Sequence, residues 1–245
     1  MKSITFSNES SLKFIGSKAF SNCYNLESII FPKAVESIKK SAFNNCSELK
    51  SITISNESFF MNIGKYAFYY CFNLESFIIP KLVKSIKDFA FYNCVELKYV
   101  TIPKSTKFIK SHAFFNCKKL KSVIFLNDAS LSSIGIGAFS YCIDLESITI
   151  PKSIKVIERN GFLKCEKLRF ITFLNEHSLK FIGAKAFAYC YNLESIKIPK
   201  SVESIKESTF LKCEKLKSII FSNETKIKFI RKEAFLGYLQ CGPRV

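Results

Sequence analysis

The chain has 245 residues, of which 48% are hydrophobic, enough for a long buried core. Its 37 Lys and Arg against 20 Asp and Glu give a formal net charge of +17, which permits nucleic acid, anionic lipid or acidic glycans as partners. The lysines are spread evenly along the chain, as on an ordinary solvated surface. No apolar run of about 18 residues suggests a membrane-spanning helix, and the start Met1 to Phe6 shows no signal peptide.

A short motif recurs along the whole chain, first as Ala-Phe-x-x-Cys-x-x-Leu at Ala19–Leu26. Its Phe returns at steps of 23 or 25 residues, at Phe20, Phe43, Phe68, Phe91, Phe114, Phe139, Phe162, Phe187, Phe210 and Phe235. A fixed short period predicts a stack of small units. We therefore expect residues 1–245 to form one array of ten units, in which residues 236–245 are an irregular C-terminal tail.

Each unit is expected to contain one strand, because apolar residues two apart, such as Ile29 and Phe31, give a strand one buried face. The strand around residues 28–31 has equivalents near 2–6, 50–54, 75–79, 98–102, 121–125, 146–150, 169–173, 194–198 and 217–221. The strands are too far apart for tight hairpins, and the same returning segment follows each. They should therefore be parallel and in register, about 4.8 Å apart.

Two kinds of turn follow the strands. Five are Pro-Lys, in which proline ends the strand cleanly, at Pro32, Pro80, Pro103, Pro151 and Pro199. Five are two residues longer and contain Asn and an acid, at Asn8-Glu9, Asn56-Glu57, Asn127-Asp128, Asn175-Glu176 and Asn223-Glu224. An isoleucine then precedes every repeat Phe by five residues. Phe, Cys and Leu follow three apart, which suits a short 3₁₀ or single α turn.

Nine cysteines share one position of the repeat: Cys23, Cys46, Cys71, Cys94, Cys117, Cys142, Cys165, Cys190 and Cys213. Neighbours could approach to disulfide distance, but their number is odd and side chains in a parallel ladder point the same way. Metal-ligand spacing is lacking, so we expect no metal and no cofactor. The pattern favours a ladder of buried free thiols, and hence a reducing, cytoplasmic compartment. Cys241, outside the ladder, is the candidate reactive thiol.

The residue after each repeat Leu alternates in charge with the kind of unit. It is acidic at Glu27, Glu75, Glu146 and Glu194, and basic at Lys50, Lys98, Lys121, Arg169 and Lys217. Stacked strands would place opposite charges side by side, which stabilises each pair by roughly 0.2–1 kcal/mol. The alternation fails once, where two Pro-Lys units are adjacent and Lys98 should face Lys121.

The run from Leu145 to Ile157, followed by Gly161-Phe162-Leu163-Lys164-Cys165, resembles the BspA-type leucine-rich repeat, L-x-x-I-x-I-P-x-x-V-x-x-I-G-x-x-A-F-x-x-C. The resemblance covers roughly residues 2–236, although Tyr238 stands where the last Cys belongs. It implies a right-handed leucine-rich-repeat solenoid of about ten coils. A parallel β-sheet would line the concave side, with short 3₁₀ or α turns or irregular segments opposite. It also implies a bacterial or protist surface antigen or adhesin, a cell-surface location at odds with the free thiols.

Serine dominates one exposed strand position, and Tyr99 and Phe170 interrupt it beside Lys98, Lys121 and Arg169. Exposed aromatic residues beside basic ones are typical of a binding patch, although drift at a tolerant surface position gives the same pattern. These five residues are our candidate ligand-binding site.

Catalytic patterns are missing, because the two histidines, His112 and His177, lie in no metal-binding or triad motif. We expect no enzyme but a recognition or adhesion scaffold, which binds a protein or glycan through the sheet and its flanking turns. The alternative is a cationic surface for acidic polymers or anionic membrane, with any membrane contact peripheral. Nucleic acid is not favoured, because the Asn-acid turns interrupt the basic edge. Sequons at Asn8, Asn45, Asn56 and Asn223 are interpreted as chance matches.

Overall fold

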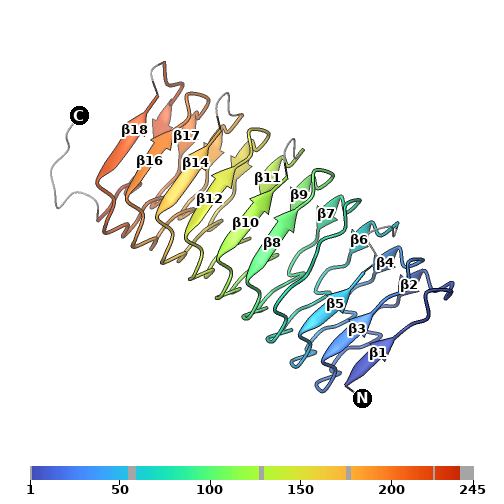
Figure 1. The fold of residues 1–245 in the computed structure, drawn as a ribbon. Helices are drawn as coiled ribbons and strands as arrows, with labels where there is room; N and C mark the ends of the chain where they lie inside the picture. Colours follow the sequence, from blue (N-terminus) through green and yellow to red (C-terminus); the bar gives the residue numbers. More distant parts are fainter. Residues whose placement is uncertain (1, 55–58, 127–129, 175–177, 223, 238–245) are drawn as a thin grey trace.

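The computed structural model describes residues 2–54, 59–126, 130–174, 178–222 and 224–237. The chain winds into an elongated stack of parallel coils, with its two ends at opposite ends of the stack (Figure 1). Every strand pair joins residues 23 or 25 apart in parallel. The predicted parallel solenoid of short repeats is thus confirmed. The turns centred on residues 56, 127 and 175, His177, Asn223 and the tail with Cys241 fall outside the described residues.

The longer strands form one side of the stack, here called the long-strand face. They are β1 (Ser3–Thr5), β3 (Ser28–Ile30), β5 (Ser51–Thr53), β8 (Tyr99–Ile102), β10 (Ser122–Phe125), β12 (Ser147–Ile150), β14 (Phe170–Phe173), β16 (Ser195–Ile198) and β18 (Ser218–Phe221). Their pairing is divided into the groups β1-β3-β5, β8-β10 and β12-β14-β16-β18. Inward-facing Ile29, Ile148 and their equivalents are buried, as the alternation predicts, except at the two ends of the stack, where Ile4 and Ile219 are half-buried.

The prediction of a strand at residues 75–79 is wrong in extent. Only Ser76 is paired there, through isolated bridges to Ser51 and Tyr99. The next residue is Phe77, where most other units have isoleucine or valine. Its buried ring lies 5.0 Å from that of Phe68 and 5.1 Å from that of Phe91. Phe77 is larger than the isoleucine or valine of the other units, and overpacking of this kind shifts the backbone, which is a physical reason for the lost ladder.

A second sheet, which the sequence did not predict, contains one two-residue strand from each coil. Its ten strands are β2 (Phe14–Ile15), β4 (Ser37–Ile38), β6 (Asn62–Ile63), β7 (Ser85–Ile86), β9 (Phe108–Ile109), β11 (Ser133–Ile134), β13 (Val156–Ile157), β15 (Phe181–Ile182), β17 (Ser204–Ile205) and β19 (Phe229–Ile230). We call it the short-strand sheet. The second residue of each strand is the repeat isoleucine, which is buried from Ile15 to Ile205.

The Ala-Phe-x-x-Cys segment closes each coil through a run of single turns, and the described residues contain no helix, so the irregular alternative is the one observed. The residues two before and two after the repeat Phe adopt positive φ, as at Ser41 (55°) and Asn45 (62°). Alternate N–H groups therefore point along the stack: Phe43 donates to Ala67 of the next coil at 2.8 Å. The N–H groups between them close turns within the coil, as from Cys46 to Phe43 at 3.3 Å. This third hydrogen-bonded column stacks the Phe rings about 5 Å apart.

The ladder cysteines line this column as free thiols. All are buried except Cys23, which is half-buried. From Cys46 onward, each Sγ donates to the carbonyl of the repeat Phe of the preceding coil, at 3.0–3.3 Å. From Cys71 onward, burial raises the pKa of the thiols, to about 12 for Cys213. They therefore act as small apolar residues that also satisfy a carbonyl group.

Candidate functional site

The long-strand face exposes two side chains on each strand. The first is mostly serine, and the second is isoleucine, threonine or lysine. Tyr99 interrupts the serine row and is 58% exposed, while Ile78 and Ile124 on the neighbouring coils are 73% and 51% exposed. An exposed apolar cluster on an otherwise polar face is a candidate for a contact surface.

Three of the five predicted site residues lie together on β8 and β10. Tyr99 is in register with Ser122, so Lys98 and Lys121, the preceding residues, are neighbours. The Lys98 ammonium lies 2.8 Å from Glu75 on the other side, and this pairing lowers the pKa of the Glu75 carboxyl. Among the described residues, no carboxylate lies within ion-pair distance of Lys121. Lys121 faces Lys98 on one side and forms no ion pair with Glu146 of the next coil on the other, so it is available to an acidic group.

The other two predicted residues, Arg169 and Phe170, lie on the second group of strands, at β14. The Arg169 guanidinium lies 2.8 Å from Glu194 and 5.2 Å from the centre of the Phe170 ring, so it is held by both an ion pair and a cation–π contact. Phe170 is three strands from Tyr99, or roughly 14 Å at ordinary strand spacing. The five candidates therefore form two clusters, on either side of a break in the sheet.

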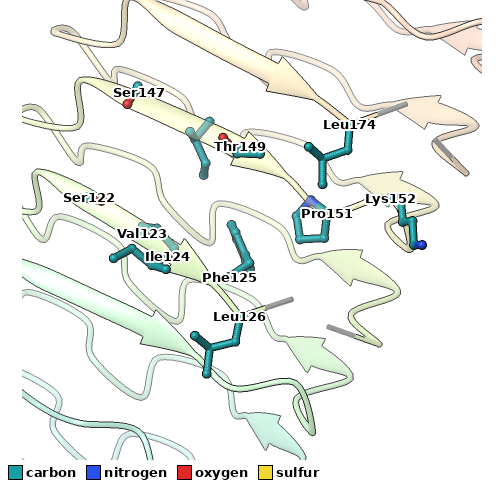
Figure 2. Close-up of a pocket in the computed structure, with 11 residues that line it drawn as sticks. Ser122, Val123, Ile124, Phe125, Leu126, Ser147, Thr149, Pro151, Lys152 and Leu174 are labelled. Carbon is teal, nitrogen blue, oxygen red and sulfur yellow. The ribbon is translucent and has the colours of Figure 1, made fainter. Parts of the chain in front are cut away.

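That break, between β10 and β12, contains a groove of about 590 Å³. The two strands are neighbours but share no ladder, and Phe125 lies between their ends (Figure 2). Leu126 and Pro151 flank Phe125, and the Lys152 side chain lies at the rim beyond Pro151. The groove thus combines an apolar floor with a basic edge.

A second groove of about 480 Å³ repeats this arrangement two coils later, between β14 and β16. Only the first two residues of β14 pair with β16, and the strands part beyond Ile171. Leu174, Pro199 and Lys200 occupy the places that Leu126, Pro151 and Lys152 hold in the first groove. Both grooves lie where a strand ending in Phe precedes one ending in Ile-Pro.

Sequence reasoning missed the apolar residues of the grooves. Ile124, Leu126 and Leu174 are 46–51% exposed, as is typical of surface-lining rather than core side chains. One signal was available in the sequence: isoleucine and threonine share the second exposed strand position, and each isoleucine there adds apolar area to the face. The grooves themselves had no local signal, because they depend on pairing between coils.

No group of three potential metal ligands is found in the described residues. His112 is stacked on Phe89, with ring centres 5.0 Å apart, and desolvation lowers its pKa. It lies in the turn column rather than beside either groove. No helix that could cross a membrane was found in the part of the chain that the structure describes. The long-strand face therefore offers noncovalent contact: apolar area, hydroxyl groups and lysine charges.

Comparison with known proteins gives consistent results. The sequence profile described as BspA type leucine rich repeat region matches residues 1–61, 61–178 and 132–240. The structure resembles a leucine-rich repeat protein from Bacteroides ovatus, at 27% identity and a TM-score of 0.72, covering 96% of this chain and 72% of that one. It also resembles a leucine rich cell surface protein from Faecalibacterium prausnitzii, at 25% identity and a TM-score of 0.52, covering 91% and 88%. No curated protein matches.

Proposed function

Because the chain belongs to the BspA-type leucine-rich repeat family, we propose that it is a non-catalytic recognition scaffold that binds a protein partner through its long-strand face. The groove between β10 and β12 is the observation that carries the proposal. Exposed Tyr99, Ile124 and Leu126 extend its apolar surface. Large apolar and aromatic side chains around a depression are typical of the central residues of protein interfaces.

The chemistry around the groove indicates what the partner should present. An apolar side chain would fill the space beside Phe125, and an acidic group would pair with Lys121 or Lys152. An extended segment suits the surface, because exposed side chains lie in straight rows along the stack. The name of the Faecalibacterium protein places that relative at the cell surface. This supports, for our chain, an adhesion role in which the groove contacts a protein on another surface.

The test is selection of peptides from a random twelve-residue phage library on the purified full-length protein. We expect enriched peptides that contain both apolar and acidic residues. Their binding should weaken by about tenfold in Ile124→Thr, since the substitution removes roughly 1–1.5 kcal/mol of apolar contact. Ile220→Thr is the matched control, because Ile220 holds the same position on β18 and is 52% exposed. Equal loss in both variants, or no enrichment, would contradict the proposal.

Two further substitutions divide the predicted site. Tyr99→Ala should weaken the selected peptides because its ring lies on the β8–β10 side of the groove. Phe170→Ala should weaken them only if the segment continues to the second groove. Binding should persist at high salt, since apolar contact rather than charge provides most of the free energy. Complete loss of binding at high salt would favour the cationic alternative instead.

A further inference from the structure

The short-strand sheet carries a cluster of six lysines on the two adjacent Pro-Lys coils. Both coils have the shorter Pro-Lys turn, so their lysines occupy the same positions of the repeat. They lie side by side in three pairs: Lys81 with Lys104, Lys84 with Lys107, and Lys87 with Lys110. All six are exposed. We call this cluster the basic platform.

The register of β7 and β9 fixes this arrangement. Ser85 pairs with Phe108, and Ile86 with Ile109. The Lys107 N–H donates to the Lys84 carbonyl at 2.8 Å, and the Lys110 N–H donates to the Ile86 carbonyl at 2.9 Å. The two lysines of each pair are therefore on neighbouring strands, about 4.8 Å apart at the backbone. The three pairs follow one another along the direction of the strands.

The charge of the platform is not balanced within the described residues, where none of its six ammonium groups has an ion pair. In the same row on other coils, Lys13 lies 3.5 Å from Glu36, and Lys180 lies 2.9 Å from Glu203.

Among the described residues, no acid on the two platform coils forms an ion pair with the platform. Asp88 accepts the Ser111 N–H at 3.2 Å, and Glu96 pairs with Lys119 at 2.8 Å. Six like charges this close repel one another, and a multivalent anion would relieve that repulsion.

We propose that the basic platform binds a linear acidic polysaccharide. The negative groups of the polysaccharide would lie between the lysines of one platform coil and those of the other. The polysaccharide would run parallel to the strands. Hydroxyl groups nearby suit a sugar. Ser105 Oγ donates to the Lys81 carbonyl at 2.8 Å, and Ser132 Oγ donates to the Lys107 carbonyl at 3.2 Å. Because each hydroxyl already donates, its lone pairs can accept hydrogen bonds from the ligand, and sugar hydroxyls supply such donors.

Nucleic acid fits this surface less well. Proteins that bind single strands present free aromatic faces on which bases stack. The aromatic side chain within the platform is Phe108, and the Lys110 ammonium already lies 4.4 Å from the centre of its ring. The platform is also separate from the long-strand grooves, so this site is independent of the protein-binding role.

The experiment measures binding of a fluorescent heparin-derived decasaccharide to the full-length protein by anisotropy. We expect the Kd to rise at least about tenfold in Lys84→Gln/Lys87→Gln/Lys107→Gln, and to rise steeply with salt, because each lost cation removes a counterion-releasing contact. The matched control is Lys33→Gln/Lys40→Gln/Lys185→Gln, which removes equal charge at exposed lysines that lie in neither the platform nor a groove. Both triple variants should fold, since they change exposed side chains, and thermal melts verify this.

Each outcome decides between the alternatives. A loss confined to the platform variant supports the proposal, whereas an equal loss in the control shows diffuse charge attraction and overturns it. A single-stranded DNA of matched charge serves as a second probe, and phosphatidylserine vesicles serve as a third. If either binds as tightly as the decasaccharide and is weakened equally by the platform substitutions, the assignment to an acidic polysaccharide is overturned.

Discussion

The thiol of Cys117 donates a hydrogen bond to the carbonyl oxygen of Phe91, 3.2 Å away in the preceding coil. Burial raises the pKa of this thiol well above its usual value. The group is therefore neutral in the folded chain under conditions in which an unfolded chain begins to ionise. One residue type thereby fills a core position, satisfies a carbonyl group and links stability to alkaline pH.

This linkage predicts that the free energy of unfolding falls as pH rises above about 8.5, the ordinary cysteine pKa. Below that value both states keep the proton and the thiol contributes fully; above it, ionisation favours the unfolded chain. Cys117→Ala should reduce the slope between pH 9 and 10 by up to about 1.4 kcal/mol per pH unit. Urea unfolding in reductant measures it. Parallel curves for both proteins would show that the thiol does not contribute to the pH dependence.

Phe114→Ala should destabilise the array by about 3–5 kcal/mol, because it empties a fully buried site in the middle of the ring column. The Phe114 ring is stacked between Phe91 at 5.1 Å and Phe139 at 5.3 Å. The loss of these contacts should separate the unfolding of the two halves into two transitions. Calorimetry measures both effects. Phe108→Ala, at a 38% exposed ring, is the control and should cost much less.

Gly137→Ala should be destabilising, whereas Gly16→Ala should be close to neutral. A Cβ at Gly137 would lie 2.8 Å from His112 Cδ2, and the residue has a φ of +57°. A left-handed conformation costs an alanine about 1–2 kcal/mol. A Cβ at Gly16 meets nothing within 4 Å. Chemical denaturation of both variants measures the difference, and equal stabilities would contradict the prediction, because the cost of the left-handed conformation remains even if the His112 ring moves away.

Glu75→Gln should lower the melting temperature slightly at neutral pH, because Glu75 lies 2.8 Å from Lys98. This pairing lowers the pKa of Glu75, so the contribution is present above the ordinary carboxyl pKa and is lost as pH falls through the lowered value. The wild type and the variant should therefore converge in strong acid and at high salt. Glu146→Gln is the control. A difference that persists in acid would point to a cause other than this ion pair.

The repeat architecture could be predicted from the sequence because each coil carries the same inward-facing residues, such as Ile29 and Cys46, at the same phase. The free thiols and the sign alternation at Glu75 and Lys98 follow from that phase alone. The short-strand sheet had no comparable signal. Its strands are two residues long, and Ser37 and Ile38 are both buried, so the strand offers no alternation to detect.

The grooves and the lost strand near Ser76 could not be predicted, because they arise from packing between coils. Phe77 and Phe125 look like ordinary apolar substitutions in the sequence. Their effect on pairing appears only when neighbouring coils are placed beside them. For the same reason, the sequence suggested one patch containing Tyr99 and Phe170, whereas the structure separates the two residues by the break in the sheet.

The break between β10 and β12 also affects how the whole rod can deform. The short-strand sheet and the turn column continue across this point, whereas the long-strand face has no ladder there. A solenoid whose coils are hydrogen-bonded along two columns but not along the third bends most easily where the third is interrupted. We therefore expect the coils before and after this break to bend relative to each other about it. Such bending would widen or narrow the groove and so adjust it to a bound partner.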